Sequence, residues 1–233
     1  SESLLDDRKT GARDSARETE LAEIESRIQT ISPDMWRERI RLADRAAELI
    51  CELERPDYEI TNALNRHLNL AQDHGDLVQK SEALYLFVYR TVANCEEPDD
   101  TSVCRRYAEF EEAVLSDKSK INISRLITLW MVLATRHRVG LSKFDESAHA
   151  DVIDRIIEEL SQDENRRSTY FEVALRYQPM RLVRGAAPSD VLAESKSLLE
   201  SAAGIAGVDF SVLTALFDIS DDFVEEPLFD QVA

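Results

Sequence analysis

Apolar residues recur along almost the whole chain at the spacing of one face of an α-helix. In one representative stretch, Ile60, Ala63, Leu64 and Leu68 follow one another at intervals of three or four positions. Side chains at these intervals stand on the same side of a helix, so the pattern predicts helices that each bury one face. The sequence has no convincing alternation of apolar and polar residues and no Asn-Gly or Asp-Gly hairpin turn. We therefore expect an all-α fold.

Start and stop signals divide this pattern into about nine or ten helices. Ser32-Pro33-Asp34 combines a hydroxyl cap, a proline and an acid, which favour a helix start. Gly140 predicts a helix end, and Thr169 with Glu172 forms a capping box before a helix that kinks or stops at Pro179. The expected helices cover residues 14–30, 33–53, 58–73, 77–95, 102–116, 121–139, 144–161, 169–179, 190–204 and 210–217.

The helix starts are regularly spaced along the chain. Starts near residues 33, 77, 121 and 168 lie roughly 44 residues apart, a period found in stacked helical hairpins. We expect stacked antiparallel hairpins, as a bundle or as a short solenoid of the tetratricopeptide or HEAT kind, although Trp36 is not followed by a tetratricopeptide signature. The expected organisation is a flexible segment at 1–13, one helical domain at 14–218 and an acidic tail at 219–233.

The chain is strongly acidic. It has 46 Asp and Glu against 28 Lys and Arg, for a formal net charge of −18 over 233 residues. Nucleic acids and anionic membranes attract basic surfaces, so this charge disfavours extensive binding to either. Arginine greatly outnumbers lysine, which fits either a salt-adapted surface or a genome rich in G and C.

The charge is also unevenly distributed. Residues 185–233 carry ten acids and one base, whereas residues 166–184 carry five arginines and one acid. Arginine and tyrosine side chains share a helical stripe there, and they can stack on bases, bind phosphate or carboxylate, or pair with the chain's own acids. The candidate binding residues are Arg136, Arg138, Arg166, Tyr170, Tyr177, Arg181 and Arg184.

The acidic end of the chain also contains large apolar residues. Such acidic–apolar segments often become ordered on a partner. A second hypothesis is that the acidic tail folds back onto the basic stripe. The candidate partner-binding residues of the tail are Phe217, Phe223, Leu228 and Phe229.

Two acidic clusters resemble parts of metal sites. Glu146 and His149 have the spacing of two ligands on one helical face, but a di-iron bundle needs a second such pair, which the sequence lacks. Asp221 and Asp222 lie in a short acidic run near the end of the chain. The chain has no Gly-x-Ser-x-Gly motif and no phosphate-binding glycine loop. We therefore expect no metal, no cofactor and no catalytic residue.

The cysteines and the hydropathy bear on the compartment. Cys51, Cys95 and Cys104 are odd in number and form no Cys-x-x-Cys motif, so we expect free and mostly buried thiols. A disulfide between Cys95 and Cys104 stays open as the alternative. The sequence contains no run of about 18 apolar residues, the length expected of a membrane span, and residues 1–7 do not resemble a signal peptide. We expect a cytoplasmic protein.

These patterns favour a non-catalytic protein–protein interaction module, such as an adaptor, a regulatory subunit or an inhibitor. The alternatives are a regulator that contacts nucleic acid through the arginine–tyrosine stripe and an acidic inhibitor that mimics DNA. A third reading is a helical metal-dependent enzyme. The expected partner is another protein, with a local nucleic-acid contact as the alternative and no membrane contact. The oligomeric state stays open.

Overall fold

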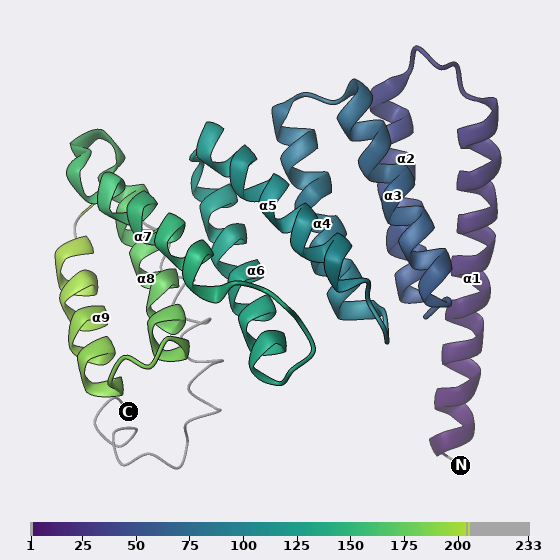
Figure 1. Cartoon of the computed structure of the whole chain (residues 1–233). Helices are drawn as coiled ribbons and strands as arrows, with labels where there is room; N and C mark the ends of the chain where they lie inside the picture. The colour runs from purple at the N-terminus through teal and green to yellow at the C-terminus, as the bar shows by residue number, and fades with distance from the viewer. Residues whose placement is uncertain (1, 204, 206–233) are drawn as a thin grey trace. The chain divides into compact units, whose positions relative to one another are not determined.

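The computed structural model of the chain describes residues 2–203 and 205, with side chains from Arg13 onward, and this part is helical throughout (Figure 1). The described residues contain nine α-helices and one short 3-10 helix, and no strand. The predicted all-α fold class is confirmed. The predicted helix at 210–217 and the acidic tail at 219–233 lie outside the described residues.

The chain divides into two compact units, Ser1–Ala113 and Val114–Ala233, within the span where we expected one helical domain. The first contains α1 (Glu2–Thr30), α2 (Trp36–Glu52), α3 (Asp57–His74), α4 (Leu77–Asn94) and most of α5 (Asp100–Ser116). The second contains α6 (Lys120–Arg138), α7 (Glu146–Gln162), a 3-10 helix (Glu164–Arg166), α8 (Arg167–Val183) and α9 (Pro188–Ala202).

In the first unit, helices pack against their neighbours in chain order. α1 packs on α2, α2 on α3 and α3 on α4, and the rings of Tyr85 in α4 and Phe110 in α5 lie 6.1 Å apart. Ile60, Leu64 and Leu68 are at most 1% exposed, which confirms the predicted apolar face of α3. Successive apolar faces therefore cover one another, as in stacked helical hairpins.

In the second unit, α8 lies at the centre. It contacts α6, α7 and α9, and residues 171–175 are all buried. Pro179 is inside α8, which continues to Val183 rather than stopping at the proline. Glu172 is only 2% exposed, and its carboxylate binds the Lys120 ammonium of α6 at 2.8 Å. Because α8 already begins at Arg167, Glu172 is an interior residue and not part of the predicted capping box.

Several helix boundaries differ from those predicted. The Met35 amide donates to the Ser32 carbonyl at 3.0 Å, so the predicted start signal forms a turn and α2 begins only at Trp36. α1 begins at Glu2 and includes residues that we expected to be frayed. Asp57 is the first residue of α3, and its carboxylate accepts from the amides of residues 96 and 97 after α4. Contacts with residues elsewhere in the chain, and not only local capping patterns, therefore determine where these helices begin.

α1 is attached by a small apolar contact and by ion pairs. Of its described side chains, Leu21 and Ile24 are the only apolar ones that are buried. Hydrogen bonding to Arg45 lowers the pKa of the Glu20 carboxyl, as expected for an established ion pair. Four pairs join α1 to α2 and the turn after it: Arg17–Glu52 and Arg45–Glu20 at 2.8 Å, Arg55–Glu18 at 2.6 Å and Arg27–Glu38 at 2.8 Å.

A buried histidine lies among α2, α3 and α4. His67 is 4% exposed, as expected for a residue on the apolar face of α3. Its Nδ1 lies 3.9 Å from an Asp44 carboxylate oxygen, which also accepts from Arg90 at 2.7 Å. Burial lowers the pKa of His67, and the nearby Asp44 opposes that effect only in part. His67 is therefore held in the neutral form in the folded protein.

The thiols are free. Cys51 and Cys95 are buried, Cys104 is half-buried, and all three lie among the described residues. Burial raises the pKa of the Cys51 thiol to about 11. The predicted free thiols are therefore present, and the alternative Cys95–Cys104 disulfide is not formed.

The ion pairs of α1 predict a salt effect confined to that helix. Raising NaCl to about 1 M shortens the screening length to roughly 3 Å, which weakens exposed pairs but not apolar packing. We expect amide hydrogen exchange over residues 13–30 to accelerate several-fold, and exchange in α3 to change little. Mass spectrometry of the exchanged protein measures both helices in one sample. An equal response in α1 and α3 would contradict the electrostatic attachment.

The buried His67 predicts a loss of stability in acid. The unfolded chain takes up a proton near pH 6.5, whereas folded His67 takes it up only at lower pH. The unfolded state therefore binds more protons in this window, and the unfolding free energy falls as the pH drops through it. Urea titrations at about pH 7 and pH 5 should show a smaller loss in His67→Gln than in the wild type. His74→Gln, at an exposed position of the same helix, is the control and should retain the wild-type loss.

Candidate functional site

Two helices of the second unit, α6 and α8, end in the same way. Several candidate binding residues lie in or next to the last turns of these two helices. Gly140 after α6 and Gly185 after α8 have φ values of 79° and 91°, a conformation that side chains other than glycine rarely adopt. In each case the next amide bonds back into the helix, from Leu141 to the Arg136 carbonyl at 2.8 Å and from Ala186 to that of Arg181 at 2.9 Å. These are Schellman helix ends, so both helices stop abruptly.

Arg138 joins three helices at this end of the unit. Its guanidinium binds the Glu146 carboxylate at the start of α7, with Nη2 2.7 Å from Oε2. It also donates to the Val183 carbonyl in the last turn of α8. Hydrogen bonding to Glu146 raises the pKa of Arg138. Arg138 therefore satisfies a helix C-terminus and is not free for an external anion.

Tyr177 and Arg184 of the predicted stripe meet at Asp154 of α7. The Arg184 Nη1 lies 2.9 Å from both Asp154 oxygens and 2.9 Å from the Tyr177 hydroxyl. The tyrosine hydroxyl donates to the same carboxylate. Burial, followed by the hydrogen bond to Asp154, raises the pKa of Tyr177 to about 12. Asp154 thus occupies the arrangement that a carboxylate or phosphate ligand would need.

The remaining stripe residues point to different neighbours. Arg181 binds Glu194 of α9, and Arg166 donates to the Lys118 carbonyl before α6. Tyr170 packs against the apolar cluster that joins α8 to α9. Arg136 is half-buried, and we find no ion pair for it within the described residues. The structure therefore brings together Tyr177 and Arg184 at Asp154, while Arg138 binds the separate partners Glu146 and Val183.

Of the two clusters that resemble parts of metal sites, the structure describes only the one formed by Glu146 and His149. Glu146 binds Arg138, and the ring of His149 stacks on Phe144 with the centroids 4.9 Å apart. Within the described part of the chain, no three His, Cys, Asp or Glu side chains are placed to share a metal ion. Asp221 and Asp222 lie outside the described residues, as do the tail candidates Phe217, Phe223, Leu228 and Phe229.

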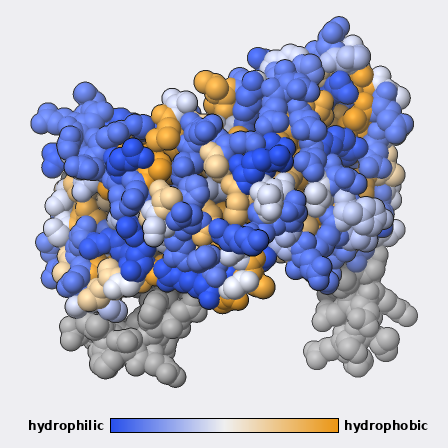
Figure 2. Space-filling view, in the orientation of Figure 1, coloured by the Kyte–Doolittle hydropathy of each residue, from blue (hydrophilic) through white to orange (hydrophobic). Residues whose placement is uncertain are grey.

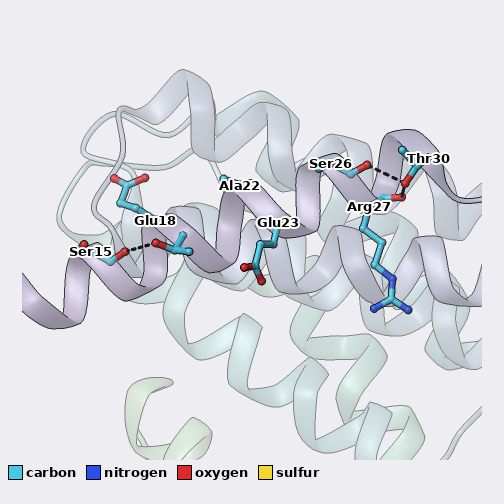
Figure 3. A pocket seen from close by; sticks show the side chains of 8 residues that line it. Ser15, Glu18, Ala22, Glu23, Ser26, Arg27 and Thr30 are labelled. Atoms are coloured by element: carbon cyan, nitrogen blue, oxygen red, sulfur yellow. Dashed lines mark hydrogen bonds between the residues drawn. The ribbon is translucent and has the colours of Figure 1, made fainter.

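The outer face of α1 carries a shallow depression of about 790 Å³ (Figure 3). Its hydroxyls bond to their own helix: Thr19 donates to the Ser15 carbonyl at 2.9 Å, and Thr30 to that of Ser26 at 3.1 Å. The flanking Glu18 and Arg27 are already paired with other helices. Most polar side chains on this face are therefore already engaged, which leaves few hydrogen-bonding groups for a small ligand.

A second depression, of about 480 Å³, lies where α2 begins, and the sequence did not reveal it. It is lined by residues 34–38, and the Arg37 guanidinium lies 4.9 Å above the Trp36 ring. The helical period placed Trp36 on the buried stripe of α2, yet it is half-buried and borders this depression. Trp36 lies in the first turn of the helix, next to Met35. This terminal position is the sequence signal that could have indicated its partial exposure.

Comparisons with known proteins add no assignment: the chain matches no protein-family model, and no curated protein or solved structure is similar to it. In the part of the chain with described structure, no helix combines the length and apolar character of a membrane span.

The Asp154 contacts predict a titration shift. Asp154→Asn removes the negative charge beside Tyr177, so the pKa of Tyr177 should fall from about 12 toward its ordinary value near 10. The fall should be incomplete, because burial still disfavours the phenolate. NMR of ¹³C-labelled tyrosine measures this directly. Asp151→Asn, one turn earlier on the exposed side of α7, is the control, and an equal shift in both variants would contradict the contact.

Proposed function

We propose that the chain is a cytoplasmic protein–protein interaction module, which acts as an adaptor, regulatory subunit or inhibitor. The proposed docking surface is the end of the first unit at which α2 and α4 begin. The α1–α2 and α3–α4 connections both lie at this end (Figure 1). α2 and α4 also contact each other within this unit.

The observation that carries the proposal is the kind of residue exposed there. Met35, Leu77 and Val78 are 54%, 67% and 64% exposed, and Trp36 borders the depression of about 480 Å³. Single exposed apolar residues are ordinary, but three large ones beside a half-buried tryptophan at one end of a unit are not. Tryptophan, methionine and arginine are enriched at the centres of protein interfaces. This composition fits a surface that receives a protein partner.

Protein binding also has better support than nucleic-acid binding. Arg138, Arg181 and Arg184 each bind a carboxylate of the same chain. A phosphate would have to displace those carboxylates, on a chain whose net charge of −18 repels nucleic acid. We therefore place protein binding ahead of the nucleic-acid alternative.

The proposal predicts that partner binding depends on Trp36 and Leu77. Truncating a hot-spot residue of an interface costs about 2 kcal/mol or more, which is roughly a 30-fold loss of affinity. In affinity purification from cells that express the protein, Trp36→Ala and Leu77→Asp should each lose partners that the wild type retains. The bound proteins are quantified by mass spectrometry, and circular dichroism verifies the fold of each variant.

Tyr58→Asp is the matched control. Tyr58 is 65% exposed in the first turn of α3, where that helix follows the end of α2. This variant should retain the wild-type partners. Recovery of the same partners by the wild type and by both test variants would refute this docking surface, as would an equal loss in Tyr58→Asp.

A further inference from the structure

The connection between α6 and α7 forms a basic and apolar surface on an otherwise acidic chain. We define the basic loop patch as residues 136–143, which contain two arginines, one lysine, one histidine and no acid. Val139 and Leu141 in this patch are 64% and 58% exposed. Hydrophobic surface appears over this connection at the lower edge of the second unit (Figure 2). The patch therefore combines positive charge with exposed apolar side chains.

The backbone of the patch explains why its apolar side chains stay exposed. In a Schellman end, the residue after the glycine commonly packs back onto the last turn of the helix. Here the Leu141 amide makes the expected bond to the Arg136 carbonyl, but the Leu141 side chain remains largely exposed. The helix end is thus satisfied in its hydrogen bonds, while no described residue covers Val139 and Leu141.

The charge of the patch is only partly neutralised by the described chain. Glu146 binds Arg138, and Arg138 also holds the last turn of α8 beside the patch. Arg136 is half-buried and makes no ion pair within the described residues. Positive charge next to exposed aliphatic side chains suits a ligand that combines carboxylates with large apolar groups.

The acidic tail of this chain, residues 219–233, has that composition. It contains five acids and no base, together with Phe223, Val224, Leu228 and Phe229. Ile205 packs on the cluster between α8 and α9, so the tail is tethered to the same unit as the patch. The chain from Ile205 to Phe223 can span up to roughly 60 Å at 3.3 Å per residue, whereas α8 is only about 26 Å long. The tail can therefore reach the patch from any side of the unit.

We propose that the acidic tail docks on the basic loop patch of its own chain, with Phe223 against Val139 and Leu141 and its carboxylates near Arg136. Tethering favours this occupant, because covalent linkage makes docking intramolecular and raises its effective concentration, typically to about the millimolar range. The inference does not depend on the proposed function, whose surface lies in the first unit. It assigns the patch as the site at which the chain's own tail binds. A partner with a similar acidic segment must displace that tail in order to bind the patch.

Photo-crosslinking of the full chain tests the proposal. Phe223 is replaced by the photoreactive p-benzoylphenylalanine, the protein is irradiated, and crosslinked peptides are identified by mass spectrometry. We expect crosslinks to residues 136–143 of the same chain. Mixing ¹⁴N- and ¹⁵N-labelled protein separates crosslinks within a chain from those between two copies. Val139→Asp and Arg136→Glu should each lower the yield several-fold, and about 1 M NaCl should lower it as well.

Tyr58→Asp is again the matched control, because Tyr58 in α3 is 65% exposed, like Val139, and lies outside the proposed docking surface. It introduces the same charge on the first unit and should leave the crosslink yield unchanged. Three results would each overturn the proposal: crosslinks mainly outside residues 136–143, crosslinks mainly between two copies, or a yield unaffected by Val139→Asp. Because Val139 is exposed, its substitution should not unfold the chain, and circular dichroism verifies this.

Discussion

The structure depends on the burial of one apolar face of each helix by its neighbours in the chain. Helices of 15 to 19 residues, the lengths of α2 to α9, are only marginally stable alone in water. α3 gains its stability because Ile60, Leu64 and Leu68 are covered, and α8 because α6, α7 and α9 surround it. α1 packs mainly on α2, so its outer face is polar, and ion pairs add to its attachment.

Arginine side chains provide most of the polar connections between these helices. Arg45 binds both Glu20 and Glu48, Arg138 binds a carboxylate and a carbonyl, and Arg184 binds Asp154 together with Tyr177. The guanidinium offers five donors in a rigid plane, whereas the lysine ammonium is a compact point charge. One arginine can therefore bridge elements that one lysine could not. The excess of arginine over lysine has a structural use here, whatever its origin.

Features set by residues close in sequence could be predicted, and those set by distant partners could not. Helical period depends on neighbours three and four positions away, so the buried face of α3 and the helix end at Gly140 were predictable. The capping box at Glu172 was misleading because its partner, Lys120, is 52 positions away. The partners of the arginine stripe were unpredictable for the same reason, since Arg184 pairs with Asp154 on another helix. Spacing along one helix does not identify an acid across the core.

The basic surface of the second unit follows from how α6 and α8 end. The C-terminus of a helix carries partial negative charge on its free carbonyls, which favours cations in the last turn. Arg138 in α6 and Arg184 after α8 occupy such positions, and Arg138 binds a carbonyl of α8 directly. These cations thus have a folding role before any ligand is considered. The tail proposed to dock beside them therefore meets Arg136, which makes no ion pair within the described residues, rather than Arg138 or Arg184, which Glu146 and Asp154 already occupy.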